Sequence, residues 1–134
     1  MPAEVFFDTS VLIYLITESD TRSSIAEELL SAGGKLSVQV LNEFVAVARR
    51  KLGLEWEEIG EALAAVRTLC HAPIPIALKT HEAAVDIAQR YGFHIYDSLI
   101  VAAAVEAGCT TLYSEDLQHG QMIQSVTVRN PFLA

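Results

Sequence analysis

The stretch YDSLIVAAAV, residues 96–105, decides how the rest of the chain is organised. Leu and Ala favour a helix and no Gly or Pro interrupts the stretch, so we predict a helix here. Apolar residues fall on nearly every side of this helix, which is typical of a helix buried inside a protein. Asp97 stands at its start, on the same face as Ile100 and Val101. As a helix N-cap Asp97 would be ordinary, but an unpaired carboxylate at the edge of a core needs a positive partner.

Length and composition indicate one globular domain that spans residues 1–134. Hydrophobic residues make up 51% of the chain, which excludes disorder and provides a large core. The formal net charge is -8. This charge argues against partners that are bound by bulk electrostatics, such as duplex DNA or an anionic membrane. It still allows nucleic acid to bind at a cleft where a metal ion supplies local positive charge.

The sequence carries no signal for a membrane or for export. No apolar run approaches the roughly 18 residues of a membrane span. Residues 1–4 lack the basic region and apolar core of a signal peptide. Cys70 and Cys109 form neither a metal-binding spacing nor a disulfide framework. We therefore expect a cytoplasmic protein.

Short β-rich runs alternate with helical stretches along the chain. We predict strands at residues 5–7, 36–38, 111–113 and 126–128. We predict helices at residues 11–15, 23–32, 40–51, 55–70, 80–90 and 96–105. Thr80 is the expected cap of the helix at 80–90, and Glu57, Glu58 and Glu61 are expected to face solvent. This alternation is typical of an α/β fold with a mostly parallel sheet covered by helices on both faces.

Four acidic residues fall where a ligand site could form. Asp8 directly follows the first strand and Asp116 follows the strand at 111–113, so both belong to the carboxyl edge of the sheet. Glu43 borders the apolar face of its helix, and Asp97 begins the central helix. Singly, each has an ordinary explanation, such as a helix cap for Asp8 or a solvated side chain for Glu43. If the four meet, their mutual repulsion requires protons or a divalent cation to neutralise them.

The donor atoms of this acidic set favour a hard metal ion. Oxygen ligands without Cys or His suit Mg²⁺ or Mn²⁺ better than zinc. A water on such an ion can be activated to attack a phosphodiester. Other chemistries fit less well, because the four histidines show no zinc-ligand spacing and no phosphate loop or dinucleotide-binding motif is present. The G-x-S-x-G elbow of serine hydrolases is also missing from the sequence.

Four short motifs carry a family resemblance. They are FDTSVL (7–12), QVLNEF (39–44), YDSLI (96–100) and YSEDL (113–117), in this order along the chain. Together they resemble the four acidic motifs of PIN-domain ribonucleases, most closely the VapC-type toxins of prokaryotic toxin–antitoxin pairs. The resemblance covers essentially the whole chain. It implies a three-layer α/β/α sandwich, an endoribonuclease dependent on Mg²⁺ or Mn²⁺, a cognate antitoxin that blocks the cleft, and a homodimer.

Matched position by position, the resemblance assigns the catalytic and metal-binding acids to Asp8, Glu43, Asp97 and Asp116. Asp8 and Asp97 match direct metal ligands, whereas Glu43 and Asp116 match positions that bind through water or a second ion. Glu115 stands beside Asp116 and is an alternative ligand. The family pattern favours Asp116, which follows the small residue Ser114 by two positions.

Three functions stay open at this point. The first is a toxin endoribonuclease, and the second is a housekeeping RNA-processing nuclease of the same fold without an antitoxin. The third is a non-catalytic module whose acidic cleft binds arginines of a partner. For a nuclease, single-stranded or loop RNA is the expected substrate, because the attack needs an accessible strand. Candidate phosphate contacts are Arg22, Lys35, Arg49, Arg50 and Lys51.

Overall fold

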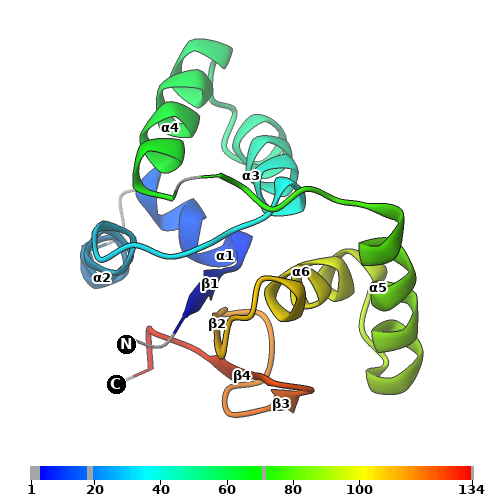
Figure 1. Ribbon diagram of the computed structural model, residues 1–134. Helices are drawn as coiled ribbons and strands as arrows, with labels where there is room; N and C mark the ends of the chain where they lie inside the picture. The colour runs from blue at the N-terminus through cyan, green and yellow to red at the C-terminus, as the bar shows by residue number, and fades with distance from the viewer. Residues whose placement is uncertain (1–3, 18–19, 71, 134) are drawn as a thin grey trace.

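A four-stranded sheet lies at the centre of the chain (Figure 1). The computed structural model describes residues 4–17, 20–70 and 72–133. The strands are β1 (Val5–Phe7), β2 (Thr111–Tyr113), β3 (Met122–Ile123) and β4 (Val126–Arg129). Their order is β1-β2-β4-β3, in which β1 pairs with β2 and β2 with β4 in parallel, whereas β3 is antiparallel to β4. The prediction of an α/β fold with a mostly parallel sheet is confirmed.

Helices cover the sheet on both sides. They are α1 (Thr9–Leu12), the 3₁₀ turn η1 (Ile13–Leu15), α2 (Asp20–Ser31), α3 (Val38–Arg50), α4 (Trp56–Leu69), α5 (Leu78–Tyr91) and α6 (Ile95–Glu106). In Figure 1, α2 lies to the left of β1 and α6 lies to its right, with α5 packed against α6. This arrangement is consistent with the three-layer α/β/α sandwich that the resemblance to PIN domains implies.

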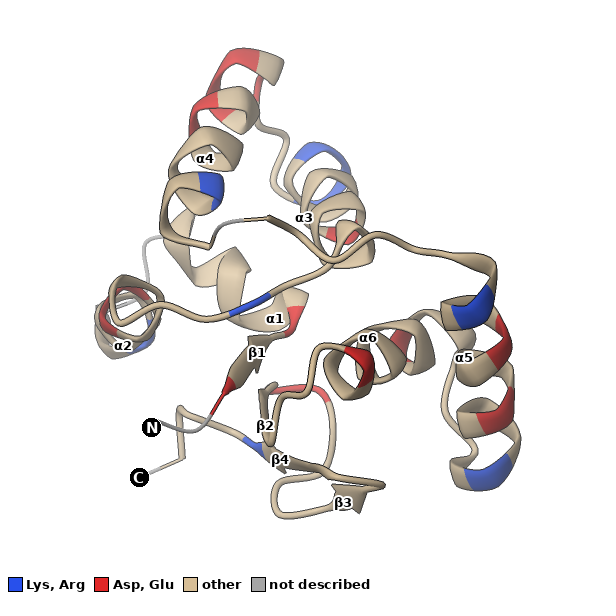
Figure 2. Cartoon of the chain, viewed as in Figure 1, with Lys and Arg blue, Asp and Glu red and all other residues tan. Residues whose placement is uncertain are grey.

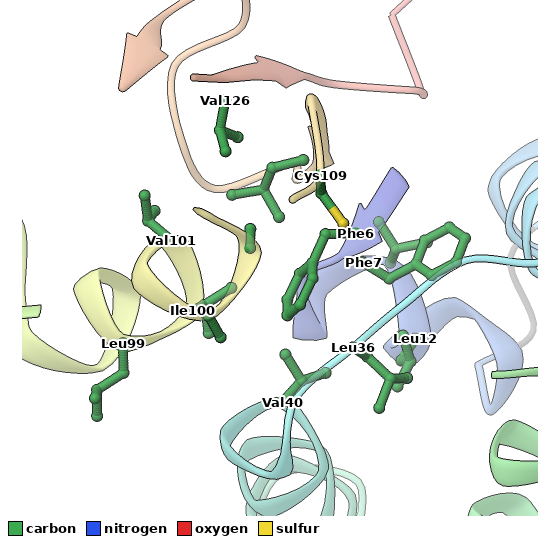
Figure 3. Close-up of a cluster of buried hydrophobic side chains, with 14 of the residues drawn as sticks. Phe6, Phe7, Leu12, Leu36, Val40, Leu99, Ile100, Val101, Cys109 and Val126 are labelled. Atoms are coloured by element: carbon green, nitrogen blue, oxygen red, sulfur yellow. The ribbon is translucent and has the colours of Figure 1, made fainter. Parts of the chain in front are cut away.

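Helix α6 forms the centre of the core, as its sequence predicts. Every residue from Ser98 to Ala104 is buried. Figure 3 shows Phe6 of β1 within a cluster that also contains Ile100 of α6 and Val40 of α3. Burying one such side chain contributes about 1.5–3 kcal/mol, so the contact of α6 with the sheet is strong. It fixes the first turn of α6, and with it the position of Asp97.

The predicted strand at residues 36–38 is wrong. Lys35 makes one isolated parallel bridge with Phe6, and Ser37 makes another with Ile74, so the segment is extended without forming a strand. The cause is Ser37, whose hydroxyl accepts a hydrogen bond from the backbone N–H of Val40 at 3.3 Å and caps α3. The chain therefore enters a helix before it can continue the ladder. Strand β3, which the sequence analysis missed, comprises only two residues.

Several helix boundaries differ from those predicted. The first helix begins at Thr9 and tightens into η1. Helix α2 begins at Asp20 rather than at residue 23. The N-cap residue of α5 is Ala77 rather than Thr80, although the side chain of Thr80 takes part in capping. Thr80 lies in the first turn, where its hydroxyl accepts a hydrogen bond from the N–H of Ala77 at 3.2 Å. The helices at 40–51 and 55–70 are confirmed within two residues, and the three glutamates of α4 are exposed as expected.

The interpretation of Asp97 as an ordinary N-cap is also wrong. Helix α6 begins at Ile95, and its N-cap is His94, whose Nδ1 accepts a hydrogen bond from the N–H of Tyr96 at 3.2 Å. Asp97 is the third residue of the helix. Its carboxylate is therefore not needed as the cap of α6.

Among the described residues, no helix is long and apolar enough to cross a membrane. Residues 1–3, on which the signal-peptide prediction depends, and His71 lie outside the described part of the chain. Cys70 and Cys109 are buried free thiols, in agreement with the absence of a disulfide framework. Burial raises the pKa of Cys70 to about 11.

Candidate active site

Four separate segments each bring one carboxylate to the same region. Asp8 joins β1 to α1, Glu43 lies in α3, Asp97 lies in the first turn of α6, and Asp116 follows β2. Figure 2 shows acidic segments where β1 meets α1, on α3 and on α6. The charges of Asp8, Asp97 and Asp116 all act on Glu43. The structure thus brings together the four acids that the sequence singles out.

Asp8 is the most deeply buried of the four, with 4% of its surface exposed. Its backbone N–H donates to the carbonyl of Tyr113 at 3.0 Å, which extends the pairing of β1 with β2 and carries the side chain into the core. Its Oδ2 accepts hydrogen bonds from the hydroxyls of Ser10 and Ser114, each at 2.8 Å. Although Asp8 occupies the N-cap position of α1, its side chain makes no capping bond. Burial raises the pKa of Asp8 and outweighs the two serine hydrogen bonds, which lower it.

The pKa values of the other three acids are also raised. Burial raises the pKa of Asp97, the charge of Asp116 adds to this, and His94 opposes it. Asp116 is exposed, yet loss of hydration at the site raises its pKa. The charge of Asp8 is the second cause and also raises the pKa of Asp116. Burial likewise raises the pKa of Glu43, although Gln39 Nε2 donates a hydrogen bond to Glu43 Oε2 at 3.0 Å and lowers it. Lost hydration and mutual repulsion therefore act together on all four carboxylates.

No basic side chain within the described ranges is paired with these four acids. The ion pairs that these ranges contain are Arg22–Glu115, Lys35–Glu4 and Arg90–Asp86. Nor does the described part of the chain contain a group of three or more His, Cys, Asp or Glu side chains arranged to hold a metal ion as it stands. The donors fit a hard divalent cation in kind, since all are carboxylates. Asp97 is partly buried and Asp116 is exposed, so both side chains can be reached from solvent.

Glu115 takes part in a different network. Its carboxylate accepts hydrogen bonds from Tyr14 Oη at 2.6 Å and from Arg22 Nε at 3.0 Å. Its backbone N–H donates to Ser10 Oγ at 3.0 Å. Because Arg22 already pairs with Glu115, this arrangement favours Asp116 over Glu115 as the acid available to a ligand.

The family follows from a comparison of the sequence with family models. The PIN domain model matches residues 5–122, a range that contains all four carboxylates. The chain belongs to the PIN domain family. A comparison with curated proteins finds no match.

Three solved structures with a similar fold are a toxin and two complexes of toxin–antitoxin systems. The Mycobacterium tuberculosis toxin VapC20, which cleaves the sarcin–ricin loop, is 22% identical with a TM-score of 0.69, over 84% of this chain and 90% of that chain. A toxin–antitoxin complex from Klebsiella pneumoniae is 20% identical with a TM-score of 0.73, over 96% and 98%. VapBC2 from Rickettsia felis, bound to a promoter DNA fragment, is 18% identical with a TM-score of 0.68, over 93% and 96%. At these identities the likeness concerns the fold.

The five basic residues considered as phosphate contacts have different surroundings in this PIN domain. Lys51 lines a cavity together with Glu43 and Asp116. Arg22 and Lys35 are held in ion pairs, and Arg49 donates to the carbonyl of Leu54 at 2.9 Å. Arg50 is exposed in the last turn of α3 and does not line this cavity. Lys51 is therefore the candidate that the structure places beside the acids.

Sequence reasoning missed two tyrosines near the acids of the PIN domain. Tyr14 lines the cavity that contains Lys51, and Tyr96 lines a neighbouring cavity. Their positions offered a signal, because Tyr96 directly precedes Asp97 and Tyr14 follows Ser10 by one helical turn. Both residues sit within or beside an acidic motif.

Proposed function

We propose that this PIN domain is an endoribonuclease that depends on Mg²⁺ or Mn²⁺ and acts as the toxin of a toxin–antitoxin pair. One observation carries the proposal: four carboxylates from four segments act on one another, have raised pKa values and pair with no basic side chain of the described residues. A divalent cation neutralises such a cluster. The similar M. tuberculosis structure, a toxin that cleaves the sarcin–ricin loop, supports the assignment.

Asp8, Asp97 and Asp116 would hold the ion, with Glu43 beside them. A bound Mg²⁺ or Mn²⁺ polarises a phosphate oxygen and lowers the pKa of a water, which prepares the attack on a phosphodiester. Ser10 and Ser114 orient Asp8, because the hydroxyls of both donate hydrogen bonds to its Oδ2. Glu43 is half-buried and accepts a hydrogen bond from Gln39 Nε2 at 3.0 Å, and it would bind the ion through water or bind a second ion, as the resemblance implies.

The same acids supply a reason for a protein inhibitor. A cognate antitoxin that inserts an arginine among the carboxylates would pair with them and block the cleft. The similar structures from K. pneumoniae and R. felis are toxin–antitoxin assemblies, which supports this partner. A housekeeping nuclease of the same fold would act without one. Inhibition by the product of a neighbouring gene would favour the toxin, whereas an antitoxin bound only to a remote face would contradict the inserted arginine.

A homodimer is also predicted by the family resemblance. Sedimentation of the purified domain at several concentrations measures its oligomeric state. A monomer at all concentrations would contradict this prediction without affecting the nuclease proposal.

Cleavage of total cellular RNA by the purified protein tests the nuclease. The reactions contain Mg²⁺, Mn²⁺ or EDTA and compare the wild type with Asp97→Asn and with the control Asp86→Asn. Asp86 lies on α5 and pairs with Arg90 at 3.1 Å, so its loss should not affect the acidic site. We expect discrete fragments from the wild type and the control in the presence of metal. We expect none with EDTA or from Asp97→Asn, and undiminished cleavage by this variant would refute the proposal.

A further inference from the structure

Two cavities adjoin Glu43, which contributes to the lining of both. The first cavity, of about 390 Å³, is also lined by Tyr14, Lys51 and Asp116. The second cavity, of about 300 Å³, is also lined by Gln39 and Tyr96. Both volumes reach the lower end of the range for small-molecule sites, about 300–1,000 Å³. The acidic site therefore has a recess on either side of Glu43.

The first cavity combines an apolar wall with a cation. Ile13 and Val47 supply aliphatic surface beside the ring of Tyr14. Lys51 is exposed, and its charge acts on Asp116, where it opposes the rise in pKa. Lys51 has no ion pair with another described residue. An ammonium group in this position can bind a phosphate next to the acids.

The second cavity combines an exposed aromatic ring with amides. Tyr96 is 54% exposed although it directly precedes Asp97, and its ring lies 5.0 Å from that of His94 between centroids. Gln39 and Asn42 line the same cavity and provide both donors and acceptors. Stacking on an aromatic ring, together with hydrogen bonds to a base edge, is how proteins bind unpaired nucleotides.

We propose that the two cavities receive the nucleotides on either side of the phosphodiester that is cleaved. In the second cavity a base stacks on Tyr96. In the first, Lys51 binds a backbone phosphate, and the adjoining sugar and base lie against Ile13, Val47 and Tyr14. This inference rests on the proposed nuclease function and specifies its ligand as single-stranded RNA, because a base can reach Tyr96 only when it is unpaired.

The composition of the first cavity favours RNA over a segment of a protein partner. Glu43, Glu115 and Asp116 attract a cationic segment and Lys51 repels it, whereas a phosphate would be attracted by Lys51 and by the divalent ion that the proposed function requires at the acids. The net charge of -8 repels an RNA backbone in general. Lys51 is exposed and forms no ion pair among the described residues, so it provides local positive charge beside the acids. A protein occupant is retained as an alternative outcome of the test.

Variants of the two cavities test the proposal against matched controls. The cavity variants are Tyr96→Ala, Tyr96→Phe and Lys51→Gln. The controls are Tyr91→Ala and Lys79→Gln, which replace exposed residues of α5 that line neither cavity. Cleavage of a defined single-stranded RNA oligonucleotide gives kcat and KM for each variant. Fluorescence anisotropy with the same oligonucleotide, in an Asp8→Asn background, gives the affinity at several salt concentrations.

We expect Tyr96→Ala to raise KM and weaken RNA binding about tenfold, the usual effect of losing one stacked base. Tyr96→Phe should restore both values, since it keeps the ring. Lys51→Gln should weaken binding and reduce the slope of log affinity against log salt by about 0.7, as expected for one contact to a single-stranded backbone. Both controls should behave as the wild type.

The outcomes separate this proposal from the nuclease proposal. Metal-dependent cleavage with unchanged KM and RNA affinity in all cavity variants would overturn the subsites and leave the nuclease intact. If no protein cleaves the oligonucleotide, the nuclease proposal is in question, and the anisotropy measurements still decide the subsites. Equal RNA affinity of the wild type and Tyr96→Ala would then overturn them. Weakened binding of the antitoxin, with unchanged RNA binding, would assign the cavities to a protein segment and likewise overturn the proposal.

Discussion

Replacing Ser114 by alanine should weaken the fold far more than the loss of one oxygen atom suggests. Ser114 is fully buried, and its hydroxyl donates to Asp8 Oδ2 at 2.8 Å. The same hydroxyl accepts hydrogen bonds from the backbone N–H groups of Asp116 at 3.1 Å and of Leu117 at 3.2 Å. Ser114→Ala removes all three bonds and leaves the buried carboxylate of Asp8 with one serine donor in place of two.

The magnitude follows from the kinds of bond that are lost. A hydrogen bond to a charged group contributes about 1.5–3 kcal/mol and a neutral one about 0.5–1.5 kcal/mol. Counting both backbone bonds at their lower value, because water can partly replace them, gives a loss of about 3 kcal/mol. For 134 residues the unfolding entropy is about 0.28 kcal/mol/K, so Tm should fall by about 11 °C.

Thermal and urea denaturation followed by circular dichroism, with EDTA at pH 7, measure this loss. Ser10→Ala is the matched control, because Ser10 makes the same 2.8 Å bond to Asp8 from a half-buried position. Water can replace its hydroxyl, and we expect a loss of about 1 kcal/mol. A double-mutant cycle of Ser114→Ala with Asp8→Asn isolates the bond between them. A decrease in Tm of less than about 4 °C for Ser114→Ala would refute the reasoning from burial. Equal losses of unfolding free energy in the two serine variants would refute it as well.

Three further predictions concern the stability of the domain. Folding raises the pKa of Asp8, so the folded state binds more protons than the unfolded state. This proton binding stabilises the fold below the unfolded pKa of 3.8, and the stabilisation is lost as the pH rises through the pKa that Asp8 has in the folded state. The Tm of Asp8→Asn relative to that of the wild type should therefore increase between pH 4 and pH 8. A difference in Tm that stays constant over this range would contradict the prediction. Mn²⁺ at about 100 times its dissociation constant should stabilise the wild type by about 2.7 kcal/mol, measured by urea denaturation, and should not stabilise Asp97→Asn. Gly34→Ala should cost about 1–3 kcal/mol, because the added Cβ would overlap the Phe7 ring, whereas Gly60→Ala, with open space around its Cβ, should not destabilise. Equal Tm values for these two glycine variants would show that the ring moves aside at no cost.

The frame of the fold could be predicted because local patterns decide it. The run of β-formers at residues 5–7 and the uninterrupted helical stretch at 96–105 have no competing local interpretation. At residues 36–38 two local preferences compete, since Ser37 can sit in a strand or cap a helix. In the structure Ser37 caps the helix through its hydrogen bond with Val40. Residues 36–38 alone do not indicate which of the two conformations forms.

The four acids that the structure brings together could be singled out from the sequence, but their partners could not. Asp8 is recognisable by its position at the end of a strand. The bond between Arg22 and Glu115 joins residues 93 positions apart, and no periodicity relates them. The same holds for Tyr14, whose hydroxyl reaches Glu115 from the opposite end of the chain. Such pairs depend on the order of strands in the sheet, which short sequence patterns do not specify.

The bond between Asp8 and Ser114 joins residues 106 positions apart, and this distance matters while the protein is being made. The chain emerges from the ribosome with β1 first, whereas its neighbour β2 follows only after α6. Until β2 has emerged, Asp8 has neither the hydrogen bond from Ser114 nor Asp116 beside it. Under the proposed function, a nascent chain that still lacks β2 and Asp116 has an incomplete acidic site and cannot yet cleave the RNA of the ribosome that makes it.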